Sequence, residues 1–185
     1  ERTLLYGFVN DIKEENNLFW LGTGDEGLVR YKDNTAQATY RPEGPNSNYS
    51  YRLRMVGDKL YMLPGGRWAS QNDAAGHIMI YENGEWLNIT SKQIQGITGK
   101  KALDFMNVIV DPEDHEHFFV TSYGTGLYEF KKDVLINHYT PSNSILGSAA
   151  PNSPDRYTRT SYAAYDNDGM LWVNVDGGTD TTLVA

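Results

Sequence analysis

The fold is decided by two short runs near the N-terminus, Phe19-Trp20-Leu21-Gly22-Thr23 and Gly27-Leu28-Val29-Arg30-Tyr31. Both runs are rich in aromatic and branched side chains, which favour strands, and a glycine-containing turn separates them. The segment 22–27 also fits G-x-G-x-x-G, the phosphate-binding loop of dinucleotide sites. That loop must be followed by a helix, whereas another strand is expected here. We therefore interpret the glycines as turn residues of a β-hairpin.

This hairpin recurs in four units along the chain. Each unit is expected to begin with a strand followed by a turn that contains Asp11, Asp58, Asp111 or Asp166, and these aspartates are 47, 53 and 55 residues apart. The predicted first strands are 5–9, 51–56, 105–110 and 162–165, and the predicted second strands are 19–22, 60–63, 118–121 and 171–174. Third strands are predicted at 27–31, 77–81 and 126–130, and fourth strands at 38–40, 86–90 and 135–139. Residues 182–185 fall where the third strand of the last unit should run.

The repeat predicts an all-β chain, because no segment between the strands has a helical period apart from a short turn around 91–95. Four-stranded units at this spacing are typical of β-propeller blades, whereas a β-sandwich would not require the same four-strand order to recur. We expect about four blades, in units of approximately 1–40, 51–90, 104–140 and 160–185. The last unit lacks its outer strand, so we expect a larger propeller of roughly six to eight blades, whose remaining blades are partners of this segment.

The composition excludes several classes of function. The 185 residues carry 16 Lys and Arg against 24 Asp and Glu, a formal charge of −8, so no nucleic-acid partner is expected. The absence of cysteine excludes disulfides, thiolate metal sites and cysteine nucleophiles. No apolar run approaches the roughly 20 residues of a membrane-spanning helix, so no direct membrane span is expected.

Propeller connectivity places the turns between second and third strands, and the links between units, on one face. This face, here called the long-loop face, carries the longest connections of the chain, which are 41–50, 64–76, 91–103 and 140–160. Long loops on a rigid scaffold are where binding usually occurs. The insertion 64–76 combines an aromatic stacking surface with hydrogen-bonding groups, and its candidate binding residues are Arg67, Trp68, Gln71, Asn72 and Asp73. The alternative is that Trp68 packs into the propeller while Arg67 pairs with a neighbouring carboxylate.

Some other histidines and carboxylates of the sequence are candidates for catalysis or metal binding. The segment 111–117 holds two histidines and several carboxylates, but its Asp-Pro start favours a solvated turn. The segment 166–169 resembles part of a calcium loop without its closing glutamate, so a plain turn is again favoured. His77 and His138 have no evident catalytic partner. We predict no catalytic residue, no metal site and no cofactor, although carboxylate pairs for glycoside cleavage meet only in space and remain an alternative.

The repeats resemble the two-component regulator propeller family, whose consensus runs roughly I-W-x-G-T-x-x-G-L-x-x-Y. The stretches 19–31 and 118–130 carry this similarity, and Asp166 to Trp172 is similar to the family's D-x-x-G-x-L-W segment. The second unit departs, with Pro64-Gly65-Gly66 in place of Gly-Thr, and it most resembles the PorZ-like surface propellers associated with type IX secretion. The resemblance implies an extracytoplasmic domain, at the cell surface, outer membrane or periplasm, without a catalytic motif.

Three functions are compatible with these observations. The first is a non-catalytic module of a bacterial cell-surface protein, which binds a saccharide or protein on the long-loop face and is associated with secretion or cargo attachment. The second is the glycan-sensing extracytoplasmic domain of a hybrid two-component sensor. The third is a polysaccharide lyase or hydrolase propeller, which requires histidines and carboxylates to converge in one pocket.

Overall fold

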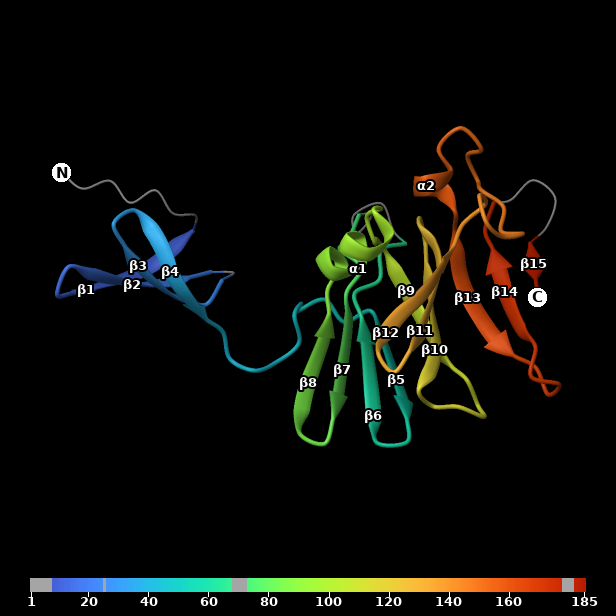
Figure 1. Cartoon of the computed structure of the whole chain (residues 1–185), viewed down its shortest axis with the longest axis horizontal. Helices are drawn as coiled ribbons and strands as arrows, with labels where there is room; N and C mark the ends of the chain where they lie inside the picture. The colour runs from blue at the N-terminus through green and yellow to red at the C-terminus, as the bar shows by residue number, and fades with distance from the viewer. Residues whose placement is uncertain (1–7, 25, 68–72, 178–181) are drawn as a thin grey trace. The chain divides into compact units, whose positions relative to one another are not determined.

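The computed structural model describes residues 8–24, 26–67, 73–177 and 182–185. Its contacts divide the chain into two compact units, Glu1–Gly44 and Pro45–Ala185, which are described separately. Within the described residues every strand pair is antiparallel, and α-helix is confined to two short segments (Figure 1). The predicted all-β class is therefore confirmed.

The unit Glu1–Gly44 contains one four-stranded sheet whose strands follow their order in the sequence. Its small core consists of Leu21, Val29 and Tyr31. The strands are β1 (Val9–Glu15), β2 (Leu18–Thr23), β3 (Leu28–Lys32) and β4 (Thr35–Tyr40).

The first strand of this sheet differs from the prediction of a strand at 5–9 and a turn at Asp11. Residues 1–7 lie outside the described part of the chain, and Asp11 lies within β1, paired with β2. The chain turns instead at Asn16 and Asn17, whose φ values are 53° and 62°. Asparagine tolerates this left-handed backbone better than most residues do, so the Asn-Asn pair supplies the turn and the prediction was wrong.

The unit Pro45–Ala185 contains three further sheets, each with its strands in sequence order. Two sheets have four strands, and β15 forms a third strand where residues 182–185 were expected to continue the last repeat. The strands are β5 (Arg52–Val56), β6 (Lys59–Leu63), β7 (Ile78–Glu82) and β8 (Glu85–Ile89); β9 (Phe105–Val110), β10 (His117–Ser122), β11 (Gly126–Lys131) and β12 (Val134–Tyr139); and β13 (Thr160–Tyr165), β14 (Leu171–Val175) and β15 (Leu183–Val184).

The sheet β9–β12 lies between the other two sheets of this unit, and its strands β9, β10 and β11 are buried on both faces, whereas β12 is partly exposed. Every residue of β9 is buried, because successive side chains point to opposite faces and each face meets a neighbouring sheet. One core contains Phe118, which lies 5.3 Å from the Tyr61 ring and stacks on Phe130 at 5.0 Å between ring centres. The next residue, Phe119, packs in the other core with Val173 of β14.

The helix α1 (Ser91–Thr98) occupies the link after β8, where only a short turn around 91–95 was predicted. Thr90 and Gln93 form a capping box, which satisfies N–H groups at the start of the helix. Gly99 ends the helix in a left-handed conformation. Ile94 lies on the inner side of the helix, and its side chain is buried. The predicted turn was shorter than the helix because it did not take account of the capping box of Thr90 and Gln93, which marks the start of a helix. A second, single-turn helix is α2 (Pro154–Tyr157).

The glycine that opens the third strand of the repeat is required by close backbone packing. Gly27 and Gly126 have φ values of 85° and 94°. A Cβ on Gly27 would lie 2.6 Å from the carbonyl oxygen of Tyr40, and one on Gly126 would lie still closer to that of Tyr139. The fourth strand therefore passes directly over this glycine in both sheets.

We expect Gly126→Ala to destabilise the protein by at least ~2 kcal/mol, because a left-handed backbone and a clash with a backbone carbonyl add together. Gly84→Ala is the matched control, since Gly84 has a φ of 89° but open space around its missing Cβ. Its loss should be about 1 kcal/mol. Urea unfolding of both variants measures the difference, and equal losses would contradict the packing argument.

Candidate functional site

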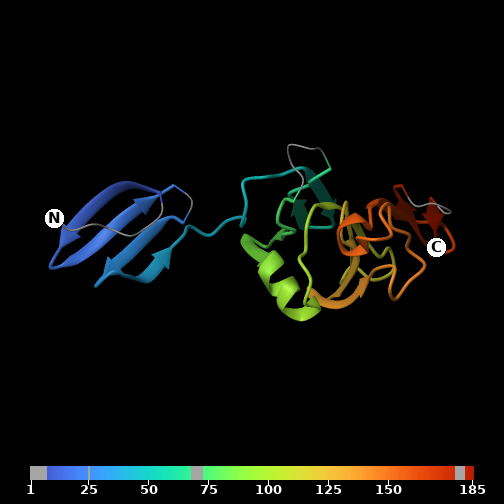
Figure 2. The same ribbon diagram turned by 90° about the horizontal axis from the view of Figure 1, so that it is seen from above.

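The long connections of Pro45–Ala185 gather at one end of the three sheets, the end that Figure 2 views. Backbone hydrogen bonds join these connections into a continuous series, so each loop is anchored to the next. The series consists of Asp104 N–H to Ala74 O at 2.8 Å, Tyr123 N–H to Asp104 O at 2.9 Å, Thr158 N–H to Gly124 O at 3.0 Å and Asp176 N–H to Arg159 O at 2.8 Å.

Two of the five predicted binding residues are described by the structure. Trp68, Gln71 and Asn72 lie outside the described residues. The Arg67 guanidinium lies 5.2 Å from the centre of the Tyr123 ring, and its Nη2 is 3.6 Å from Asp176 Oδ2. The insertion thus reaches the turns of the two following sheets.

Asp73 forms a bidentate ion pair with an arginine of the link before β13. Arg156 Nη1 and Nη2 lie 2.5 Å and 2.7 Å from the two carboxylate oxygens of Asp73. Both side chains are about half exposed, so this pair contributes little to stability and mainly orients the two loops.

Sequence reasoning missed the centre of this face, where Arg159 lies between two tyrosine rings. Its guanidinium is 5.0 Å from the ring centre of Tyr123 and 5.2 Å from that of Tyr157. Stacking of this kind holds an arginine in place without using its N–H groups. Tyr123 and Arg159 are 36 positions apart in the sequence, so only the docking of the sheets brings them together.

Two polar atoms at this centre lack a hydrogen-bond partner within the described part of the chain. They are Arg159 Nε, a donor, and Asp176 Oδ2, an acceptor, and both are buried. Unpaired buried polar atoms cost free energy, and in native proteins they are usually satisfied by water or a ligand. A ligand group that both accepts and donates a hydrogen bond, such as a hydroxyl or an amide, suits this pair of atoms.

Asp104 holds the end of the insertion 64–76 in place, and its side chain is only 5% exposed. Its Oδ1 accepts a hydrogen bond of 2.9 Å from the Ala74 N–H. Burial raises the pKa of Asp104 to about 6, against the opposing effect of hydrogen bonds from the backbone of Asp73 and Ala74. Gly66 lies so close to this carboxylate that no Cβ would fit.

The cluster at 111–117 is not a plain solvated turn, because His117 is the first residue of β10 and is clamped between two carboxylates. Its Nδ1 lies 3.0 Å from Asp111 Oδ2, and its Nε2 lies 2.8 Å from Glu129 Oε1. Glu129 Oε2 also accepts hydrogen bonds from Tyr139 and Asn137. With both ring nitrogens engaged, His117 has no lone pair left for a metal, and no metal-binding group of three such side chains occurs among the described residues.

Asp166 forms the plain turn that was predicted for 166–169. Its Oδ1 accepts the N–H groups of Asp168 and Met170 at 2.9 Å each, and its Oδ2 accepts the indole N–H of Trp172 at 2.7 Å. These donors use the carboxylate as a turn brace rather than as a calcium ligand.

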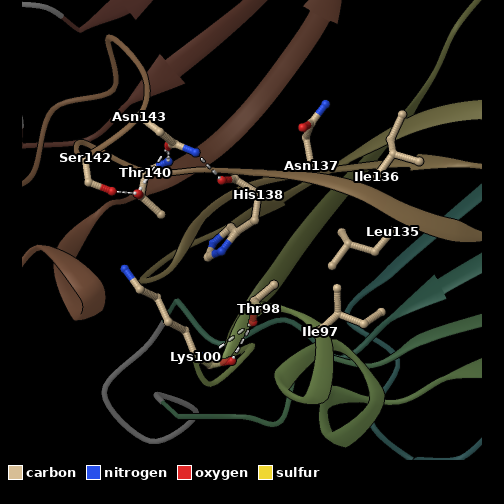
Figure 3. Close-up of a pocket in the computed structure, with 10 residues that line it drawn as sticks. All are labelled: Ile97, Thr98, Lys100, Leu135, Ile136, Asn137, His138, Thr140, Ser142 and Asn143. Atoms are coloured by element: carbon tan, nitrogen blue, oxygen red, sulfur yellow. Dashed lines mark hydrogen bonds between the residues drawn. The ribbon is translucent and has the colours of Figure 1, made fainter.

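A pocket of about 330 Å³ lies between α1 and β12 and contains His138 (Figure 3). The His138 ring stacks on Tyr128 at 4.1 Å, and its Nε2 lies 2.6 Å from the carbonyl oxygen of Thr125. Burial lowers the pKa of His138 and favours the neutral ring, and because a carbonyl oxygen only accepts, Nε2 carries the hydrogen and donates this hydrogen bond. His138 is therefore a packing residue.

The histidines do not converge in the way that the lyase or hydrolase alternative requires. His77 accepts a hydrogen bond from the Ser91 N–H, whereas His115 and His138 line different pockets and His117 is clamped. In the part of the chain that the structure describes, the pocket beside His138 and the pocket beside His115 each contain one of these four side chains.

We expect His117 to stabilise the protein below neutral pH. Partial burial opposes its protonation, but hydrogen bonds to Asp111 and Glu129 outweigh this effect and raise its pKa above the usual value. A raised histidine pKa gives stability that is complete below the unfolded value of about 6.5 and is lost as pH rises through the folded value. Urea unfolding at increasing pH from 6.5 upward should show a decline in the free energy of unfolding that His117→Gln removes. A variant that keeps the full decline would contradict the clamp.

No helix within the described ranges combines the length and the apolar character needed to cross a membrane.

Comparisons with known proteins find similar solved structures, two of which are described here, although no family model and no curated protein sequence matches the chain. The first is PorZ, an essential bacterial surface component of the type IX secretion system of Porphyromonas gingivalis, with 30% identity and a TM-score of 0.73. The match covers 87% of this chain and 22% of PorZ.

The second similar structure is the extracellular domain of a putative hybrid two-component system from B. thetaiotaomicron, with 18% identity and a TM-score of 0.50. This match covers 99% of this chain and 22% of the other, and it bears on the fold alone. The chain thus spans about a fifth of the length of either protein. Its sheets and these neighbours confirm what the repeats predicted: the chain is a β-propeller segment that resembles PorZ-like and two-component regulator propellers.

Proposed function

We propose that this chain is a non-catalytic binding module of an extracytoplasmic bacterial surface propeller, and that the long-loop face binds a saccharide or protein ligand. The single observation that carries the proposal is a pair of buried atoms that accept or donate no hydrogen bond among the described residues, Arg159 Nε and Asp176 Oδ2, the latter with only the 3.6 Å ion contact to Arg67. The Arg159 guanidinium lies beside the Tyr123 and Tyr157 rings, which supply apolar surface. A few convergent polar groups next to aromatic rings are typical of a ligand site.

The similarity to PorZ supports a place at the cell surface and an association with secretion or cargo attachment. PorZ is described as a surface component of a secretion system, and it is the more similar of the two structures in both identity and TM-score. This chain spans 22% of PorZ. We therefore propose, and do not read from the comparison, that it shares the role of a PorZ-like protein. We also propose that further blades complete its propeller.

The second candidate function is the extracytoplasmic sensing domain of a hybrid two-component system. It rests on the similarity to the B. thetaiotaomicron domain, which extends over 99% of this chain. The two functions differ in the segment that the gene encodes after the propeller. A downstream membrane helix and histidine kinase favours the sensor, and a gene without them favours the surface module.

The test of the binding site uses an array of bacterial surface oligosaccharides and peptides, probed with the 185-residue chain. Arg159→Gln removes the guanidinium with its Nε–H donor, and Asp176→Asn removes the negative charge of the acceptor, so each should weaken binding at least about tenfold, the loss expected for a hydrogen bond to a charged group. Arg156→Gln is the matched control, because this arginine lies in the same loop but is already paired with Asp73.

Binding that is equal in Arg159→Gln, Asp176→Asn and the unaltered chain would contradict the proposed site. Thermal unfolding of each variant confirms that the fold is retained. A loss confined to Arg156→Gln would move the site to the exposed Arg156–Asp73 pair and would likewise contradict the proposal.

A further inference from the structure

Two arginines on the first strand of the second sheet face a cavity away from the long-loop site. Arg52 and Arg54 lie two positions apart on β5, so their side chains leave the same side of the strand. Both line a cavity of about 430 Å³, here called the inner cavity. Its other walls come from β9 and β13, the first strands of the two following sheets, and from the turn that follows β13.

Neither arginine forms an ion pair with any carboxylate in the described ranges. Arg52 Nε is buried and has no hydrogen-bond partner there. The Arg52 guanidinium lies 5.9 Å from the centre of the Tyr51 ring, a contact that orients the group and leaves its N–H edge unused. The chain has 24 acidic and 16 basic residues, so carboxylate partners are plentiful, yet none of the described ones lies within ion-pairing distance of this pair.

The charged side chains around the inner cavity are one carboxylate and the two guanidinium groups, so two positive charges face a single negative one. Asn107 of β9 is 6% exposed and lines the cavity, and its side-chain amide bonds no described residue. Asp166 also lines the cavity, but its two oxygens already accept hydrogen bonds from Asp168, Met170 and Trp172. The arrangement is thus two guanidinium groups and an amide beside a carboxylate that is already occupied.

We infer that the inner cavity binds an oxyanion, the carboxylate or phosphate group of a ligand. A guanidinium presents its N–H donors in a planar fork that matches two oxygens of such a group, and two forks side by side add charge and orientation. The Asn107 amide supplies one further donor at the wall. The site is separate from the long-loop face, because neither Arg159 nor Asp176 lines the inner cavity.

The test follows the arginine Nε–H signals of the 185-residue chain by NMR at constant ionic strength. Inorganic phosphate and sodium acetate are titrated in separate arms against a sodium chloride reference. A saturable shift of the Arg52 Nε–H signal is expected in at least one arm. Saturation by phosphate alone identifies a phosphate group, and saturation by acetate identifies a carboxylate.

The double variant Arg52→Gln/Arg54→Gln should bind the same probe at least about tenfold more weakly, as expected when charge-assisted hydrogen bonds are lost. The matched control is Arg30→Gln/Arg41→Gln, which removes the same charge from the unit Glu1–Gly44 and should bind as the unaltered chain does. Arg52→Lys keeps the positive charge but loses the planar guanidinium, so it should bind the probe with an intermediate affinity. This variant tests the site even if the double variant does not fold.

Three results would overturn the inference: equal shifts with chloride, no saturation in either arm, or unaltered affinity in both Arg52→Lys and the folded double variant. None of these would bear on the long-loop site, whose residues are different.

Discussion

The sheet β9–β12 is the element on which the rest of the unit Pro45–Ala185 depends, because its strands β9, β10 and β11 are buried on both faces. One face packs against β5–β8 through Phe118 and Tyr61, and the other packs against β13–β15 through Phe119 and Val173. Adjacent residues of one strand therefore serve two different cores. A substitution in β10 should therefore disturb the packing against both neighbouring sheets, since closely packed interiors accommodate little change in volume.

Docking of the three sheets also positions the long-loop face. Asp104, immediately before β9, accepts a hydrogen bond from Ala74 with its side chain and another from Tyr123 with its backbone, so one residue fixes two loops. The cost of burying this carboxylate appears as a raised pKa, which is the sign of a group held in place by surrounding structure. The aromatic rings around Arg159 complete a surface that no single loop would form.

The strands followed from local signals, but the centre of the site did not. The aromatic runs and the glycine turns predicted most strands to within a few residues, because alternation and positive φ are properties of neighbouring positions. The failure at Asp11 had a local cause, an Asn-Asn turn. In contrast, Arg159, Tyr123 and Asp176 come from three segments that meet only when the sheets dock. Arg67 and Asp73 could be predicted as candidate binding residues because an insertion with that composition is itself a local signal.

Native-state hydrogen exchange tests most directly whether the β9–β12 sheet holds the long-loop face in place. The amides of β10 should exchange most slowly, through global unfolding, because both faces of this sheet are covered. The amides of Tyr123 and Asp104, which bond across to neighbouring loops, should show similar protection. Rapid exchange of these loop amides while β10 stays protected would contradict the account, since the face would then open independently of the sheet.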